Sequence, residues 1–359
     1  MHPIRAAFPF LPALVLFTTL AGAADHCVVL QYHHISEDTP GITSVTPEQF
    51  QEHMDYLRAH DHVVMPLEDV ITALKTGEPL PERCVALTID DAYVSAYEEA
   101  FPRVVRYAYP LTVFVSTDAV DNGLTGFLSW EQMREMSEHG ITFQNHSRTH
   151  DHLIRRLDDE TDDDWEQRVA ADIQYAQNRI LQELGDDPTL FAYPYGEYNL
   201  DLKRMVGSMG LIGFGQQSGP LWRQADFGAL PRFPMASIYA SMRTFPNKVL
   251  SLPLPITGAF PDEPVVPLDE WQPPLTLVFH PDAGDLQQLT CYLNGSPEVS
   301  YVWLEQPVGA VTVTARGRLN VGRNRMNCTL PIGDSGRFGW YSHNWIRRAS
   351  DGGWYRESK

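Results

Sequence analysis

Residues 84–93 read CVALTIDDAY, a nearly continuous apolar run that ends at two adjacent aspartates. An apolar run without polar alternation is typical of a strand that is covered on both faces, as in a parallel sheet. Five other runs have this character: CVVLQY (27–32), LTVFVS (111–116), ITFQNH (141–146), LFAYPY (190–195) and LIGFG (211–215). Helical patterns alternate with them at about residues 46–60, 67–76, 94–107, 130–139, 163–184, 199–209 and 235–250. The alternation predicts an α/β fold with a parallel sheet, open or closed into a barrel, whose chemistry gathers at the C-terminal ends of the strands.

The two ends of the chain differ from this central pattern. Residues 1–23 have a positively charged start, an apolar stretch and small residues at a cleavage site, which predict a secretory signal peptide and a periplasmic or extracellular protein. Residues 253–274 contain seven prolines and are predicted to be a linker. The short alternating runs of residues 275–359 predict an antiparallel β-sandwich of open role. Residues 24–252 then form the α/β domain.

The charge of the chain excludes two classes of partner. The 359 residues include 27 basic and 46 acidic side chains, which gives a formal net charge of −19. Non-specific nucleic-acid binding and docking on anionic lipid both need a surplus of Lys and Arg, so neither is expected. After the signal peptide no stretch reaches about 18 apolar residues, so no stable membrane insertion is expected. The acidic surface serves solubility or, alternatively, suits a neutral or cationic partner.

Four cysteines predict two disulfides. An exported protein can form disulfides, and four cysteines allow three pairings. Cys27 and Cys84 each open an apolar run, so their sulfurs start level if the two strands are parallel neighbours. Cys291 and Cys328 both lie in β-like runs near the C-terminus. We therefore predict Cys27–Cys84 and Cys291–Cys328, with four free or metal-binding thiols as the alternative.

Polar motifs follow three of the predicted strands. TIDDAY places Asp90 and Asp91 after one strand, NHSRTHDH places His146 and His150 after another, and FAYPYGEYN follows a third. Alone, the aspartates could cap a helix and the histidines could lie on the surface. Together they converge on one rim of the sheet, where two histidines and a carboxylate form a competent site for a divalent metal with open positions. The second carboxylate can then act as a base on a metal-activated water.

These motifs resemble those of the polysaccharide deacetylases, also called the NodB-homology or carbohydrate esterase family four domain. The family's first motif, TFDDG, stands here as TIDDA at 88–92, and its second, H-S/T-x-x-H, stands as HSRTH at 146–150. The Tyr-His pair that opens many members stands at 32–33. The resemblance covers about residues 27–250. It implies a distorted, incomplete (β/α) barrel and metal-dependent N-deacetylation of an N-acetylglucosamine polysaccharide.

The resemblance also implies roles for individual residues. Asp91, His146 and His150 would hold the metal, which is zinc or alternatively cobalt, nickel or iron. Asp90 would be the general base that acts on metal-activated water. A backbone N–H near Tyr195 would help to stabilise the oxyanion, and such a donor is typically worth on the order of 10²–10³ in rate.

Two positions depart from the family pattern. The arginine that usually orients the catalytic aspartate is replaced by Ala192, and no histidine occurs between His152 and His280, where the family's general acid is expected. We assign the orienting role to Arg232 of LPRFP as a hypothesis. His33 is the nearest replacement for the acid, with a structural hydrogen-bonding role as the alternative, and His34 and His152 are weaker candidates.

Aromatic residues and two short sequence stretches indicate the class of substrate. Tyr93, Tyr195, Trp130 and Trp222 are candidates for packing against sugar rings, although core packing is favoured for both tryptophans. The YHHI start and the LPRFP stretch resemble the exported poly-β-1,6-N-acetylglucosamine deacetylases of biofilm systems. Deacetylases of peptidoglycan, chitin or O-acetyl xylan are alternatives, as is a non-catalytic carbohydrate-binding protein. The C-terminal domain is a candidate contact for export or biofilm machinery.

Overall fold

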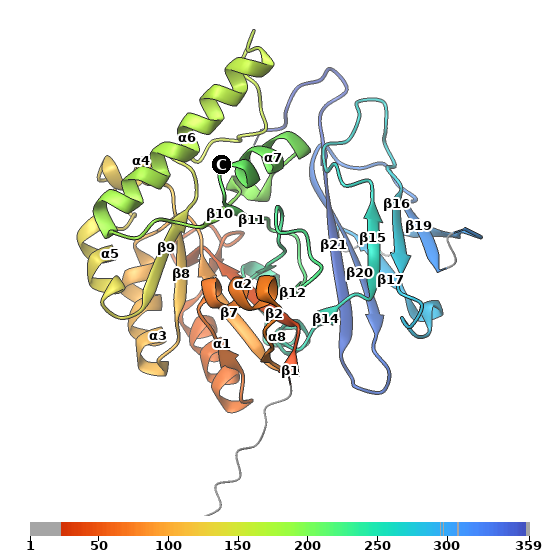
Figure 1. Cartoon of the computed structure of the whole chain (residues 1–359), viewed down its shortest axis with the longest axis horizontal. Coiled ribbons are helices and arrows are strands. Elements are labelled where there is room, and N and C mark those ends of the chain that lie inside the picture. The colour runs from red at the N-terminus through yellow and green to blue at the C-terminus, as the bar shows by residue number, and fades with distance from the viewer. Residues whose placement is uncertain (1–22, 295, 297, 307–308, 357–359) are drawn as a thin grey trace, which may run out of the picture.

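The computed structural model describes residues 23–294, 296, 298–306 and 309–356. Apart from Ala23, the predicted signal peptide lies outside the described residues. A curled α/β unit, coloured red to green in Figure 1, lies beside a β-rich unit, coloured cyan to blue. In the α/β unit the helices cover the outside of the sheet (Figure 1). The predicted α/β fold with an additional β-sandwich is confirmed.

The central sheet is parallel and does not close. Its order is β11-β10-β9-β8-β7-β2-β12, with β13 on β2 and β5 on β7. All neighbours pair in parallel except β12, which is antiparallel to β2. Every residue of β2 and β7 is buried, which is why their sequences lack polar alternation. The strands are β2 (His26–Tyr32), β5 (Val63–Val64), β7 (Cys84–Ile89), β8 (Leu111–Val115), β9 (Ile141–Asn145), β10 (Leu190–Ala192), β11 (Ile212–Phe214), β12 (Leu221–Trp222) and β13 (Phe233–Pro234).

The helices follow the predicted segments with two differences: a short helix at Thr117–Asp121 was not predicted, and the segment at about 235–250 differs. They are α1 (Pro47–Ala59), α2 (Leu67–Thr76), α3 (Phe101–Tyr107, preceded by a π-helical turn at Ala96–Ala100), α4 (Thr117–Asp121), α5 (Trp130–Ser137), α6 (Asp162–Leu184), α7 (Leu200–Ser208) and α8 (Phe245–Val249). Thr46 caps α1 through a capping box with Gln49. The single helix predicted at about 235–250 is wrong. Ser237 has a left-handed φ of 50° and Pro246 supplies no N–H, so this segment forms only a 3₁₀ turn (Ser237–Ala240) and α8.

Two four-stranded sheets form the C-terminal sandwich. Their orders are β14-β21-β20-β17 and β15-β16-β19-β18, and residues from both sheets share one apolar core that includes Leu277, Met326 and Trp345. The strands are β14 (Leu252–Pro253), β15 (Ile256–Phe260), β16 (Leu275–Phe279), β17 (Thr290–Leu293), β18 (Val299–Trp303), β19 (Ala310–Ala315), β20 (Gly322–Pro331) and β21 (Phe338–Arg347). The shorter pairs β1 (Ala23–Ala24) with β6 (Leu80–Pro81) and β3 (His34–Ile35) with β4 (Ser44–Val45) lie outside these sheets.

The proline-rich segment is not a plain linker. Strand β15 lies within 253–274 and pairs antiparallel with β16. Its prolines flank the strand rather than interrupt it, so the ladder hydrogen bonds of Ile256–Phe260 can form. The sandwich therefore begins before the predicted boundary at residue 275.

Both predicted disulfides are present. Cys27 bonds to Cys84 and Cys291 bonds to Cys328. The parallel register pairs Val28 with Val85, so the two cysteines before them lie side by side, as the sequence argument required. None of the helices in the described part of the chain is long and apolar enough to span a membrane.

Removing the first disulfide should weaken folding measurably. The Cys27–Cys84 bond closes a loop of 57 residues, and a cross-link of that span is expected to stabilise the fold by about 3–4 kcal/mol through the unfolded state. Cys27→Ala/Cys84→Ala should lower the free energy of unfolding in urea by roughly that amount. Cys291→Ala/Cys328→Ala removes the second disulfide, whose loop spans 37 residues. This variant should show a similar or slightly smaller loss of unfolding free energy. Unchanged stability in both variants would contradict the expectation.

Candidate active site

Three sharp turns bring the site together at the C-terminal ends of β7, β9 and β10. Asp91 and Ala92, just after β7, have left-handed φ values of 71° and 58°. Ser147 and His150, just after β9, have φ values of 67° and 56°. Each such residue costs of order 1–3 kcal/mol and persists only where its surroundings hold it, and such strain clusters at functional sites. The turns let successive side chains point into one rim, which a regular strand would not allow.

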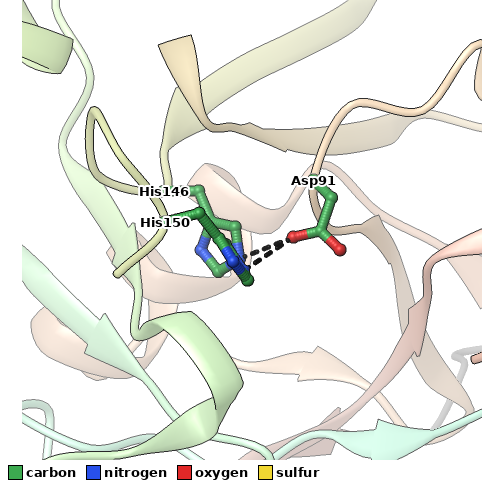
Figure 2. Close-up of side chains that lie close together, drawn as sticks. All are labelled: Asp91, His146 and His150. Atoms are coloured by element: carbon green, nitrogen blue, oxygen red, sulfur yellow. Dashed lines mark ion pairs between the residues drawn. The ribbon is translucent and has the colours of Figure 1, made fainter. Parts of the chain in front are cut away.

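Asp91, His146 and His150 form one compact donor set (Figure 2). Asp91 Oδ1 lies 3.1 Å from His146 Nε2 and 3.0 Å from His150 Nε2. His146 Nδ1 lies 2.7 Å from the carbonyl oxygen of Ala192, which can only accept a hydrogen bond, so Nδ1 carries the proton and the Nε2 lone pair faces Asp91. Burial alone would raise the pKa of Asp91, but the charge of His150 and the two imidazoles hold that pKa well below its usual range.

The donor atoms of this set fit a divalent cation. Asp91 Oδ1 and His146 Nε2 are buried and have no hydrogen-bond partner among the described residues. Buried polar atoms without a partner are rare and call for an explanation such as a bound ion. Two imidazole nitrogens and one carboxylate oxygen within 4.8 Å of one another match the three protein ligands of a catalytic zinc site with an open fourth position.

Asp90 lies beside this set in a fully buried ion pair with Arg232. Arg232 Nη1 donates to Asp90 Oδ1 at 2.6 Å and Nη2 donates to Oδ2 at 2.8 Å, and neither side chain is exposed. Gln31 Nε2 also donates to Asp90 Oδ2, at 2.6 Å. Burial raises the pKa of Asp90, but the charge and hydrogen bonds of Arg232 together with the charges of His146 and His33 outweigh it, so the net shift is downward. Arg232 reaches the site because it directly precedes β13, which pairs with β2.

Comparison with known proteins identifies the family. Residues 77–213 match the family model described as polysaccharide deacetylase. The chain is 31% identical over 198 residues to the poly-β-1,6-N-acetyl-D-glucosamine N-deacetylase of Staphylococcus epidermidis, which covers 53% of this chain and 67% of that protein. The chain belongs to the polysaccharide deacetylase family. The chain is a hydrolytic N-deacetylase. This membership favours the expected enzyme over the alternative of a non-catalytic carbohydrate-binding protein.

Relatives and solved structures agree with this membership. The enzyme of the same name from Staphylococcus aureus is 25% identical over 196 residues, which cover 53% of this deacetylase and 67% of that protein. The deacetylase PplD of Streptococcus pyogenes, in complex with acetate, has a TM-score of 0.54 at 23% identity and is matched over 93% of its chain and 59% of this one. IcaB from Ammonifex degensii has a TM-score of 0.54 at 23% identity and is matched over 96% of its chain and 63% of this one. These two structures share the deacetylase fold, but more than a third of this chain lies outside each match.

His33 lies next to both aspartates of the deacetylase. It follows β2, whose last residue Tyr32 pairs with Ile89, and the amide of Asp90 donates to the Tyr32 carbonyl at 2.9 Å. Burial lowers the pKa of His33, although the charges of Asp91 and Asp90 act in the opposite direction. His34 stacks on Tyr93 at 3.6 Å between ring centroids, and burial lowers the pKa of His34 to about 4.

The third motif of the deacetylase forms a tight turn against the metal-ligand candidates. Tyr195 has a φ of 60°, and its ring lies 4.6 Å from that of His150 and 3.9 Å from that of His152. Gly196 follows with a φ of 68°, and a Cβ there would lie 2.7 Å from the side chain of Gln216, so only glycine fits.

The four aromatic candidates have different positions. Tyr93 lies at the site, where burial and the charge of Asp91 raise the pKa of its hydroxyl, and it lines a neighbouring groove of about 520 Å³ together with His34 and Phe127. Trp130 is buried in the main core and its indole N–H donates to Asp121 at 2.9 Å. Trp222 pairs with His26 at the opposite end of β2 from the catalytic rim. The structure therefore brings Tyr93 and Tyr195 to the site, but not the two tryptophans.

Sequence reasoning missed Gln31 and Glu197. Gln31 lies in a buried strand and completes the hydrogen bonds of Asp90. Glu197, in the turn after Tyr195, is buried and accepts a hydrogen bond from His152 Nδ1 at 2.8 Å. A polar residue inside an apolar strand was the available signal for Gln31. For Glu197 the sequence offered no local signal, because its partners lie far away along the chain.

Proposed function

We propose that the chain removes N-acetyl groups from an N-acetylglucosamine polysaccharide, and that this polymer is poly-β-1,6-N-acetylglucosamine. The observation that carries the proposal is the Asp91-His146-His150 set beside an ionised, arginine-held Asp90. The names of the staphylococcal relatives and the resemblance of YHHI and LPRFP support this polymer over peptidoglycan, chitin or O-acetyl xylan. The two disulfides, together with the signal peptide that the sequence predicts at 1–23, support a periplasmic or extracellular place of action.

The residues divide the work of breaking one C–N bond. Asp91, His146 and His150 would hold one divalent ion, with zinc as the best fit and cobalt, nickel or iron as alternatives. A bound ion of this kind supplies a Lewis acid for the acetyl carbonyl and lowers the pKa of water. Asp90 takes the proton from the attacking water, because Arg232 and Gln31 keep the carboxylate ionised and oriented.

Two further groups act on the carbonyl and the leaving amine. A backbone N–H in the turn at Tyr195 donates to the oxygen that becomes negative in the transition state. His33 delivers a proton to the sugar nitrogen as the C–N bond breaks, so that acetate and a free amine leave. The groove beside Tyr93 takes the neighbouring sugar units, since the flat faces of His34, Tyr93 and Phe127 suit the C–H faces of sugars.

Replacing His33 tests its role as the proton donor. His33→Gln should lower kcat by on the order of 10²-fold and remove the limb of the pH profile that reports the acid. Steady-state acetate release between pH 5 and about 9, at equal bound metal, checks this. A variant with unchanged turnover and a lower melting temperature would assign His33 the structural role instead.

Acetate release from a panel of substrates tests the proposed polymer. The full chain, loaded with one zinc ion, is given β-1,6- and β-1,4-linked N-acetylglucosamine oligomers and O-acetylated xylan. We expect kcat/KM for the β-1,6 oligomer to exceed the other two by at least about 10-fold, the discrimination of one well-made contact. A higher value for the β-1,4 oligomer would reassign the substrate to chitin or peptidoglycan, and release only from xylan would make the enzyme an esterase.

A further inference from the structure

Glu197 is a buried carboxylate whose two oxygens connect separate parts of the chain. Its side chain is fully buried. Oε2 accepts from His152 Nδ1 at 2.8 Å, on the α/β side. Oε1 accepts from the Tyr355 hydroxyl and lies 3.4 Å from Arg323 Nη1. A buried carboxylate is stable only with such partners, so the contacts with His152, Tyr355 and Arg323 together fix the position of the Glu197 side chain.

The network continues from Glu197 to the catalytic turn. His152 stacks on Tyr195 with 3.9 Å between centroids and 13° between ring planes. The guanidinium carbon of Arg323 lies 5.5 Å from the centroid of the Tyr195 ring. Tyr195 in turn contacts His150, one of the metal-ligand candidates. One carboxylate oxygen of Glu197 therefore contacts His152, which packs on the Tyr195 ring. The other oxygen contacts the C-terminal part of the chain.

Arg323 and Tyr355 both belong to the C-terminal part. Arg323 is the second residue of β20 in the sandwich, and Tyr355 lies beyond the last strand, β21. Arg155 fixes Tyr355 from the α/β side, because its Nη1 donates to the Tyr355 carbonyl at 2.9 Å and its guanidinium lies 4.6 Å from the ring. The solved neighbours are matched over 93–96% of their lengths while more than a third of this chain is unmatched, so contacts of this kind are an addition to the shared fold.

We infer that Arg323 and Tyr355 are positioning residues for the reaction: the sandwich holds the catalytic turn at Tyr195 in its strained conformation through Glu197 and His152. This rests on the proposed function, in which the turn donates to the oxyanion. A φ of 60° at a tyrosine is unfavourable by of order 1–3 kcal/mol, so the turn persists only while its surroundings hold it. Loss of the sandwich contacts leaves Glu197 buried and poorly paired, which favours relaxation of the turn.

Kinetics of the full chain test the inference. Arg323→Met and Tyr355→Phe remove one contact each and keep the bulk of the side chain. Each should lower kcat by about 10-fold or more, since a misplacement near 1 Å can cost up to about 10²-fold, while KM changes less than about 3-fold. Bound metal should stay at that of wild type, and Arg323→Lys should recover part of the loss. Arg316→Met, at an exposed arginine of the sandwich, is the control and should behave as wild type.

A double-mutant cycle tests whether the two residues act through Glu197. Glu197→Gln should lower kcat by a similar factor, and Arg323→Met should then have little further effect in that background. Independent, multiplying losses would contradict the inference. So would wild-type kcat in both single variants, or a loss explained by reduced bound metal.

Hydrogen exchange gives a readout that does not need activity. The amides of Gly196 and Glu197 donate within the turn, to the carbonyls of Tyr193 and Pro194. In Arg323→Met and Tyr355→Phe these amides should exchange at least about 10-fold faster than in Arg316→Met, because the turn opens more often. Unchanged exchange would overturn the positioning role even if the wild-type chain released no acetate. Absence of acetate release by wild type, with faster exchange in the variants, would instead reject the proposed function alone.

Discussion

Asp91→Asn is expected to lose the bound metal and to lower acetate release by at least about 10³-fold. Asp91 Oδ1 is the one atom that both imidazoles approach, at 3.1 and 3.0 Å. An amide oxygen in its place lacks the negative charge that a divalent ligand set needs, and several kcal/mol of transition-state stabilisation depend on the ion. Metal content by plasma mass spectrometry and acetate release, measured on the same sample, check both parts of the result.

A matched variant separates metal loss from misfolding. His146→Gln removes a second ligand and should give the same two losses, while thermal unfolding of both variants should still be cooperative. Asp163→Asn is the control and should behave as wild type, because Asp163 is an exposed residue in the first turn of α6 and is not one of the three ligands. Full activity in Asp91→Asn at normal metal content would contradict the assignment of the site.

Arg232→Met is expected to destabilise the chain by about 3–5 kcal/mol and to abolish most of the activity. The substitution leaves the carboxylate of Asp90 in a fully buried position with only Gln31 as a strong donor. Breaking a buried ion pair on one side is costly because the remaining charge is uncompensated. Urea unfolding at pH 7, together with acetate release, measures both effects.

The pH dependence of this loss has a definite sign. In wild type the pKa of Asp90 is lowered, so its ion pair contributes stability above the ordinary carboxyl pKa near 4, and that contribution fades as the pH falls below that value. Without Arg232, burial dominates and raises the pKa of Asp90, so the variant should lose stability as the pH rises toward 7. The gap between variant and wild type should therefore be largest at neutral pH and shrink near pH 4.

The double variant Arg232→Met/Asp90→Asn provides the control. It removes the unpaired charge, so it should recover much of the stability lost in Arg232→Met while remaining inactive. A single variant as stable as wild type at pH 7, with no pH-dependent gap, would show that the ion pair does not hold Asp90.

Much of the catalytic rim could be predicted because its parts are local. Asp90, Asp91, His146 and His150 all follow apolar runs, and the parallel order of the strands brings their ends together. The pairing of Cys27 with Cys84 follows from the same register. Arg232 is 142 residues from Asp90, and only the missing arginine at Ala192 led to the hypothesis that it faces Asp90.

The remainder depended on contacts that no local pattern records. Neither tryptophan is marked by its neighbours in the sequence as a core or a site residue. Tertiary packing places Trp130 in the core and Trp222 at the far end of β2 from the site. Strand β15 was hidden by its flanking prolines, because turn signals dominate a five-residue strand. The ion pair of Glu197 with Arg323 joins residues 126 positions apart. This ion pair forms only because the sandwich packs against the α/β unit.

The most direct test of the account is a zinc titration of the metal-stripped chain, followed by acetate release from the β-1,6-linked N-acetylglucosamine oligomer. Asp91, His146 and His150 form one ligand set in the described part of the chain. We expect no measurable release without zinc, a rate that rises in proportion to bound zinc, and a plateau at one ion per chain. Full release by the stripped chain, or a plateau that requires a second ion, would contradict this expectation.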